Sequence, residues 1–193
     1  MAVLYRFPAQ PQPYTVGTAV TAAALTSGLG GMAIPQIPGG IIQPGARLSM
    51  RAHFEVTSTS ATPTVTVDFR FGPPGTAIGT ELVLAASPAL VINVAATAWA
   101  GTMVYNGTFR QLATAGAANG IIHGSGEVHS FFHASGGLAA SALVFPMGIT
   151  AAGRTVSTWN TSVAEQIDIG ITLSSVTGTP SIVVTDFWGE VTG

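Results

Sequence analysis

Apolar and polar residues alternate with a period of two in three separate parts of the chain. Between Arg47 and Val56 the even-numbered positions are apolar and the odd-numbered positions are polar or charged. The same alternation returns at 64–71 and at 166–173. Because successive side chains leave a β-strand on opposite faces, we expect three strands with one face toward a core. The polar positions, Asp68 and Arg70 among them, are then expected to point outward.

Shorter apolar runs between Gly, Pro or Ser residues predict further strands. The expected ranges are 82–84, 89–95, 102–112, 127–134, 142–147 and 181–191. The cluster Gly72-Pro73-Pro74-Gly75 is expected to end the strand before it. We find neither a long window with the 3.6-residue helical period nor an internal repeat of fixed length. About eight strands, with turn signals at intervals of roughly 8–15 residues, predict an all-β antiparallel sandwich or barrel.

The N-terminal segment has a different character. Pro8, Pro11 and Pro13 fix φ, so we expect 1–15 to be an extended Pro-rich arm and 16–193 to be one sandwich domain. The apolar residues of the arm are its candidate contacts with a neighbouring subunit or a larger scaffold: Val3, Leu4, Tyr5 and Phe7. The Ala- and Thr-rich stretch 18–29 fits either a short helix or an irregular edge, and the pattern leaves both open.

Charge is sparse in this chain and changes what functions are expected. Six basic residues, all Arg, and eight acidic residues make up 7% of the sequence, whereas about 25% is usual. An apolar content of 47% excludes a disordered chain. A net charge of -2 offers no basic patch, so we expect no nucleic-acid partner. The absence of Cys excludes disulfides and Cys-bearing metal sites.

Signals for export or membrane insertion are weak. Residues 1–7 contain one Arg and run directly into the prolines, which is a poor secretory signal. The longest uncharged stretch, 7–46, is interrupted by six Pro and several Gly, so we expect no transmembrane helix and no membrane partner.

Three histidines form the main concentration of possible metal ligands. They are His123, His129 and His133. On one strand His129 and His133 would share a face but lie about 13 Å apart, too far to share a metal ion. We therefore expect no metal and no cofactor, and ordinary polar or interface roles for these side chains.

Catalytic signatures are also missing, so we expect no enzyme and no small-molecule substrate. Gly124-Ser125-Gly126 lacks the spacing of a nucleophile elbow. Whether the carboxylate of Glu127 pairs with that of Glu165 or Asp168, as glycoside chemistry would need, stays open at this point.

Two other local features have structural interpretations. The three tryptophans, Trp99, Trp159 and Trp188, fit core or subunit packing better than a carbohydrate platform. Asn106-Gly107, in the middle of an expected strand, suggests a bulge or a hairpin turn.

Three groups of segments together resemble a group of bacteriophage virion proteins. They are Gln43-Pro44-Gly45-Ala46-Arg47-Leu48 leading into 62–72, Trp99 before the strand 102–112, and Asn160-Thr161 ahead of 166–173 and 181–191. In that group a Pro-Gly turn starts a strand, a Pro-Thr-hydrophobic hairpin ends in Gly, and a Trp opens the central strand. The resemblance spans roughly 34–193. It implies a jelly-roll β-sandwich that assembles as a trimer, similar to tumour-necrosis-factor-like folds, and sits on capsids or at tail and fibre tips.

We therefore expect a structural virion protein. So few charges suit a chain that buries much of its surface against its own copies and a scaffold. Our first expectation is a capsid decoration protein, a homotrimer bound to the major capsid protein on the capsid exterior and made in the host cytoplasm. The alternative is a tail or fibre-tip module that recognises host carbohydrate or protein. A genome-enclosing shell subunit is disfavoured, because the chain has no basic arm.

Overall fold

The computed structural model describes most of the chain from Pro35 onward and short segments before it. The described residues are 3–6, 14–15, 23–24, 35–58, 62–77, 79–93, 97–114, 117, 119–131, 143–148, 154–175, 177 and 180–193. Side chains are described for these ranges except 3–6, 14–15, 23–24 and 154–157.

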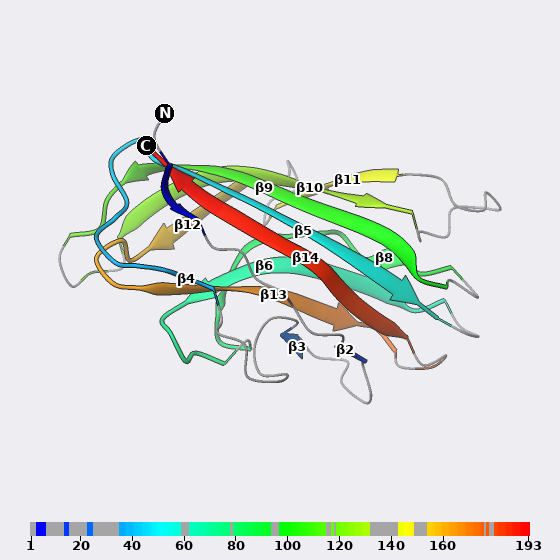
Figure 1. Ribbon diagram of the computed structural model, residues 1–193. Coiled ribbons are helices and arrows are strands. Elements are labelled where there is room, and N and C mark those ends of the chain that lie inside the picture. Colours follow the sequence, from blue (N-terminus) through cyan, green and yellow to red (C-terminus); the bar gives the residue numbers. More distant parts are fainter. Residues whose placement is uncertain are drawn as a thin grey trace.

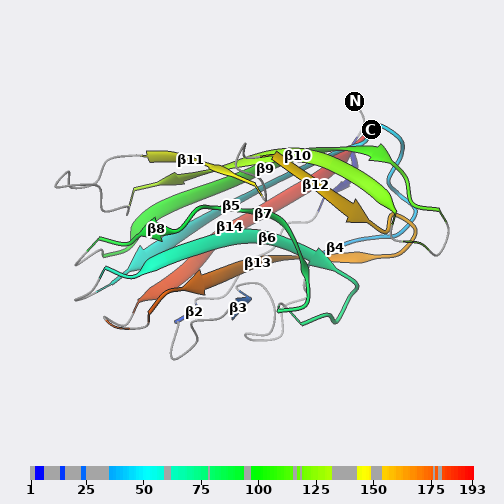
Figure 2. The same cartoon turned by 180° about the vertical axis from the view of Figure 1, so that it is seen from behind.

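Two antiparallel sheets lie face to face (Figures 1 and 2). The larger sheet has eight strands: β1 (Val3–Arg6), β2 (Tyr14–Thr15), β5 (Arg47–Thr57), β9 (Trp99–Gln111), β10 (Gly120–Ser130), β11 (Leu143–Met147), β12 (Arg154–Trp159) and β14 (Ser181–Thr192). The smaller sheet has six: β3 (Ala23–Ala24), β4 (Gln36–Ile37), β6 (Thr64–Gly72), β7 (Leu82–Ala86), β8 (Leu90–Val91) and β13 (Glu165–Leu173).

The strand pairing is that of a jelly roll. In the larger sheet β1 pairs with the last strand, β14, and β5 pairs with β9. In the smaller sheet β3 and β4 pair with β13, and β6 pairs with β7. This nested pairing, which alternates between two packed sheets, defines the fold. The expected all-β antiparallel jelly-roll sandwich is confirmed, and β10, β11 and β12 extend its larger sheet.

The core lies between the sheets and is closed by aromatic contacts across them. Phe69 of β6 stacks on Phe187 of β14, with ring centroids 6.2 Å apart. Phe71 lies almost parallel to Trp159 at 4.3 Å, and the edge of Phe109 meets Trp159 at 5.4 Å. Burial alternates along β5 as its sequence predicts. The chain exposes 8537 Å², close to the roughly 8,500 Å² expected of a compact monomer of 19.5 kDa. The described core residues are buried by the chain's own two sheets.

Several strands differ from expectation. β10 begins at Gly120 rather than at 127, and β1, β2, β4 and β12 were not predicted as strands. The Gly-rich start of β10 has a packing reason, because the buried Tyr105 ring lies over it. A Cβ at Gly124 would be 2.2 Å from Tyr105 Oη, and one at Gly107 would be 2.7 Å away. The suggestion of a turn or bulge at Asn106-Gly107 was wrong: β9 runs unbroken through both residues.

Described parts of the N-terminal segment belong to the sandwich. Val3–Arg6 pairs with β14 near its end, and Tyr14–Thr15 pairs with its start. Phe7 lies outside the described residues, and the contacts of Val3, Leu4 and Tyr5 with another subunit stay a prediction. Ala23–Ala24 forms an edge strand on β13; the rest of 18–29 lies outside the described residues. Within the described ranges, no helix is long and apolar enough to cross a membrane.

Candidate functional site

The fourteen charged side chains divide between the two sheets. Nine belong to strands of the larger sheet: Arg6, Arg47, Arg51, Glu55, Arg110, Glu127, Arg154, Asp186 and Glu190. Seven of these have described side chains, of which six are exposed and Glu190 is half-buried. The other five, Asp68, Arg70, Glu81, Glu165 and Asp168, lie in or directly beside the smaller sheet. Its four carboxylates are all buried, so the accessible charge of the described surface lies on the larger sheet.

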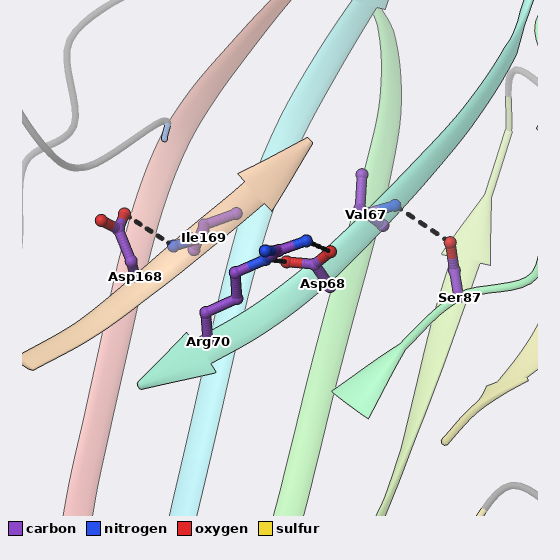
Figure 3. A network of polar contacts seen from close by, with 6 residues as sticks. All are labelled: Val67, Asp68, Arg70, Ser87, Asp168 and Ile169. Carbon is purple, nitrogen blue, oxygen red and sulfur yellow. Dashed lines mark hydrogen bonds and ion pairs between the residues drawn. The ribbon is translucent and has the colours of Figure 1, made fainter. Parts of the chain in front are cut away.

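The buried charges of the smaller sheet form an organised pair on its outer face. Arg70 donates to both oxygens of Asp68, from Nε at 2.7 Å and from Nη2 at 2.9 Å. Figure 3 shows the pair on β6 with Asp168 on the neighbouring strand β13, directly opposite Arg70 in register. The Asp68 carboxylate raises the pKa of Arg70, against the effect of burial. Asp68 and Arg70 do point away from the core as expected, but Asp68 is only 2% exposed.

A buried amide ties the β6–β7 connection to β13. Gln166 accepts a hydrogen bond from Gly75 N at 2.8 Å and donates to the carbonyl of Thr76 at 2.8 Å. It also donates to the Glu81 carboxylate. Burial raises the pKa of Glu81, and the hydrogen bond from Gln166 opposes that rise. These contacts fix the connection against the end of the smaller sheet.

The outer face of the larger sheet carries an open hollow, the face hollow, lined by Arg51, His53, Asp186, Phe187 and Trp188, with a volume of about 380 Å³. The hollow lies at a register shift between Val184 and Asp186 in the pairing of β14 with β5. Thr185 and Asp186 are both exposed, after which the inward positions change from even to odd numbers and Trp188 faces outward. Bulges of this kind re-aim side chains near binding sites.

Hydrogen bonding in the face hollow involves one imidazole. Oγ1 of Thr102 lies 2.8 Å from His53 Nδ1. Cross-strand register places Asp186 beside His53 and Trp188 beside Arg51. An aromatic ring, a guanidinium and a carboxylate therefore meet in one open site, which is a combination that binds polar ligands with flat apolar faces.

A second, smaller pocket lies at the end of the sandwich, between the β6–β7 connection and the β12–β13 turn. This end pocket has a volume of about 150 Å³. Phe71, Gly72 and Glu165 are its buried lining residues, and Pro73, Thr80, Leu82 and Thr158 are its exposed ones. Asn160, half-buried, completes it.

Glu165 is the distinctive residue of the end pocket. It is 3% exposed, and its Oε2 has no hydrogen-bond partner among the described residues. Burial raises its pKa from 4.5 to about 7, while a hydrogen bond from the backbone N–H of Asn160 opposes the rise. Asn160 is itself held in a turn, since its Oδ1 accepts from Ser162 N at 3.2 Å and Ser162 Oγ at 2.6 Å. From the sequence alone, Glu165 is only one of several candidate carboxylates, because the alternation of apolar and polar residues around it does not reveal a pocket.

The histidines and carboxylates considered from the sequence lie apart from one another. His123 is exposed, His129 bonds Glu127 at 2.8 Å, and His133 lies outside the described residues. Among the described residues, no group of three His, Asp or Glu side chains could hold a metal ion. Glu127 lies on the outer face of the larger sheet, and Glu165 lines the end pocket. Asp168 lies opposite Arg70 on the outer face of the smaller sheet. These carboxylates therefore do not form a catalytic pair.

The tryptophans divide between the core and the surface. Trp159 is 1% exposed and stacks in the core, and Trp99 packs against the core as a half-buried residue. The core interpretation is therefore confirmed for these two. Trp188 differs, because it is half-buried and lines the face hollow.

Comparisons with known proteins add little. No family model and no curated protein matches the chain. One similar solved structure is lectin I-B4 from Griffonia simplicifolia in its metal-free form, 9% identical, covering 95% of this chain and 92% of that one, with a TM-score of 0.36. Another is a conserved carbohydrate esterase of the Shiga toxin-encoding bacteriophage phi24B, 13% identical, covering 100% and 99%, with a TM-score of 0.26. Likenesses at these TM-scores carry no argument about function.

Proposed function

We propose that the chain is a structural bacteriophage virion protein that binds the outer capsid surface as a homotrimer and stabilises the head. The observation that carries this proposal is the one-sided charge. Nine of fourteen charges sit on one sheet, and the carboxylates of the other sheet are buried. Surfaces that associate are depleted of charge at their centre, whereas solvent-facing surfaces of small proteins usually carry mixed charge.

The proposal gives the two sides of the molecule different roles. The charged outer face of the larger sheet stays in solvent, and the uncharged remainder contacts copies of the chain and the shell. Two neighbours that each cover about 800 Å² would occupy roughly a fifth of the 8537 Å² of one chain. The resemblance to phage virion proteins supports the same assignment.

Light scattering on the purified chain tests the trimer. We expect a mass three times the 19.5 kDa of one chain. Ser125→Glu, which adds a charge to an exposed position of β10 on the charged side, is expected to leave that mass unchanged. A mass of one chain at every concentration, or dissociation caused by Ser125→Glu, would contradict this arrangement.

Copy number in purified particles tests the location. Hundreds of copies per particle are expected of a decoration protein, and a dozen or fewer would assign the chain to the tail. The apolar residues of 1–15 are tested by Leu4→Ser with Phe7→Ser, since deleting the whole segment would also remove β1 from its pairing with β14. We expect reduced capsid occupancy, and unchanged occupancy would remove the segment from the interface.

The face hollow favours a second candidate, a module that binds a host surface carbohydrate. A half-buried Trp188 beside the exposed Arg51 and Asp186 offers stacking and charge-assisted hydrogen bonds to a sugar. Trp188→Ala is expected to abolish binding in a glycan array, and Arg110→Ala, on the same sheet but outside the hollow, is expected to preserve it. An array without a single ligand for the unmodified chain would dismiss this candidate.

A further inference from the structure

The end pocket contains a buried carboxyl group that has neither a charged partner nor a full set of hydrogen bonds among the described residues. Glu165 continues the core-facing row of Ile167 and Ile169 on β13, yet it is a carboxylic acid at 3% exposure. Buried carboxylates are normally paired or multiply hydrogen-bonded. Within the described part of the chain, the Asn160 N–H is one donor to this carboxyl group, and Oε2 has none.

Among the described residues that line this pocket, none has a cationic side chain. Its other lining residues are Thr, Asn, Gly, Pro, Leu and Phe. Arg70 of β6 pairs with Asp68 on the outer face of the sheet, and Glu81, which follows Thr80, is bonded to Gln166 on that face. A cation from another molecule would reach Glu165 past the exposed lining residues Pro73, Leu82 and Thr158.

The shape of the pocket narrows the ligand further. A volume of about 150 Å³ corresponds to about five water molecules, close to the five heavy atoms of a lysine side chain. Leu82, Pro73 and Phe71 provide apolar walls for methylene groups. A sugar ring would need an open aromatic face, but the Phe71 ring is stacked on Trp159 at 4.3 Å. An arginine fork would need two acceptor oxygens, whereas Oε2 is the one without a donor.

We infer that the end pocket binds an alkylammonium group, the lysine side chain of a partner protein, with the Glu165 carboxylate as its counter-ion. The sequence of this chain contains no Lys, so the side chain comes from a different protein rather than from a second copy. The pocket would take such a group whether or not the partner is a capsid protein, and its failure would leave the trimer and copy-number tests untouched.

Titration with a lysine analogue tests this inference directly. The probe is Nα-acetyl-lysine N-methylamide, and its matched control is the same compound acetylated on Nζ, which keeps the stem and removes the charge. Amide NMR shifts of Thr80, Leu82 and Thr158 report binding. At pH 8 we expect the charged probe to bind at least about tenfold tighter than the control, because an adjacent opposite charge shifts a carboxyl pKa by one unit or more. Equal binding of the two, or no binding of either, would overturn the inference.

The pH dependence of probe binding provides a second test of the inference. Because the Glu165 pKa is about 7, binding of the charged probe is expected to weaken roughly tenfold from pH 8 to pH 6. Glu165→Gln keeps the side-chain shape and is expected to abolish both the preference for charge and its pH dependence. Glu127→Gln, on the larger sheet, is the control and should change neither. A preference for charge that survives in Glu165→Gln would refute the role of Oε2.

If the Glu165→Gln variant does not fold, a second variant tests the inference in its place. This second variant places an ammonium group of the chain itself beside the pocket. Leu82 lies on the rim and is 53% exposed, so Leu82→Lys is tolerated and places an amine at the pocket. We expect the pKa of Glu165, followed by carboxyl NMR, to fall by about one unit or more. Val144→Lys adds the same charge at a 55% exposed position of β11 outside the pocket and should leave that pKa unchanged. An unchanged pKa in Leu82→Lys would count against the site.

Discussion

The outer faces of the two sheets have the same kind of sequence and opposite environments. On β5 of the larger sheet, Arg51 and Glu55 alternate with core residues and are exposed. On β6 of the smaller sheet, Asp68 and Arg70 alternate in the same way, but Asp68 is 2% exposed and binds Arg70 through two hydrogen bonds. Alternation therefore reveals which side of a strand a residue takes and not whether water reaches that side. A charge on the covered face needs a partner, and one on the open face does not.

Removing one member of the buried pair is the most severe way to test this difference. Asp68→Ala leaves the Arg70 guanidinium, whose side chain is 12% exposed, without its bidentate partner. We expect the free energy of unfolding to fall by about 3 kcal/mol, measured by urea denaturation. Glu55→Ala on the open face is the control, with an expected change of less than about 0.5 kcal/mol. Similar losses for the two variants would mean that the two faces do not differ in the way described.

Adding a methyl group on β13 next to the buried pair is expected to lower the free energy of unfolding by less than Asp68→Ala does. Gly170 lies opposite Asp68 in the register of β13 and β6, and a Cβ there would be 2.1 Å from Asp68 Oδ1 and 2.8 Å from Arg70 Nε. Gly170→Ala must displace the pair, so we expect a loss of about 1–3 kcal/mol by the same measurement. A Cβ at Gly79 would meet nothing within 4 Å, and Gly79→Ala is expected to be neutral. A neutral Gly170→Ala would show that the pair is free to move.

The pH dependence of stability is expected to reveal the buried Glu165. Its pKa rises from 4.5 to about 7 on folding, so between these values the folded chain holds a proton that the unfolded chain has released. Stability from this group is therefore greatest below about pH 4.5 and falls as the pH rises, by at most about 1.4 kcal/mol per unit. Above pH 7 the fall levels off. Glu165→Gln is expected to flatten this slope in urea denaturation between pH 4.5 and 8, and identical slopes would contradict the burial of its charge.

Features of the fold that depend on neighbouring residues in the sequence could be predicted, whereas those that depend on contacts between distant residues could not. Strands β5, β6 and β13 follow from local alternation, because a half-buried strand imposes its period on its own residues. The Gly-rich half of β10 does not follow from local alternation, since Gly124 makes room for the ring of Tyr105 and Gly120 and Gly126 approach the backbone of Trp159 and Val104. The burial of Asp68 and Asp168 depends likewise on what packs across the sheet.

The candidate sites show the same limit. Within β14 the inward-facing positions change from even to odd numbers, and the sequence shows this only as a mixed pattern of Ile182, Val184, Phe187 and Trp188. The pairing with β5 is needed to identify the bulge and the hollow. The end pocket lies between the β6–β7 connection and the β12–β13 turn, and Gln166 of β13 bonds Glu81, 85 residues away, beside it. No local pattern of residues contains that contact.

The smallest expected effect concerns a single histidine–carboxylate contact at nearly the same distance as those of the buried pair, in an exposed environment. His129 Nε2 lies 2.8 Å from Glu127 Oε1, nearly the separation of Arg70 and Asp68, but the two side chains are 40% and 49% exposed. Water already solvates both groups in the unfolded and the folded chain, so their attraction contributes little. Glu127→Gln is expected to change the free energy of unfolding by less than about 0.5 kcal/mol, and the change should disappear in 1 M salt, where screening acts within about 3 Å. A loss as large as that of Asp68→Ala would show that distance, rather than access to water, sets the strength of these pairs.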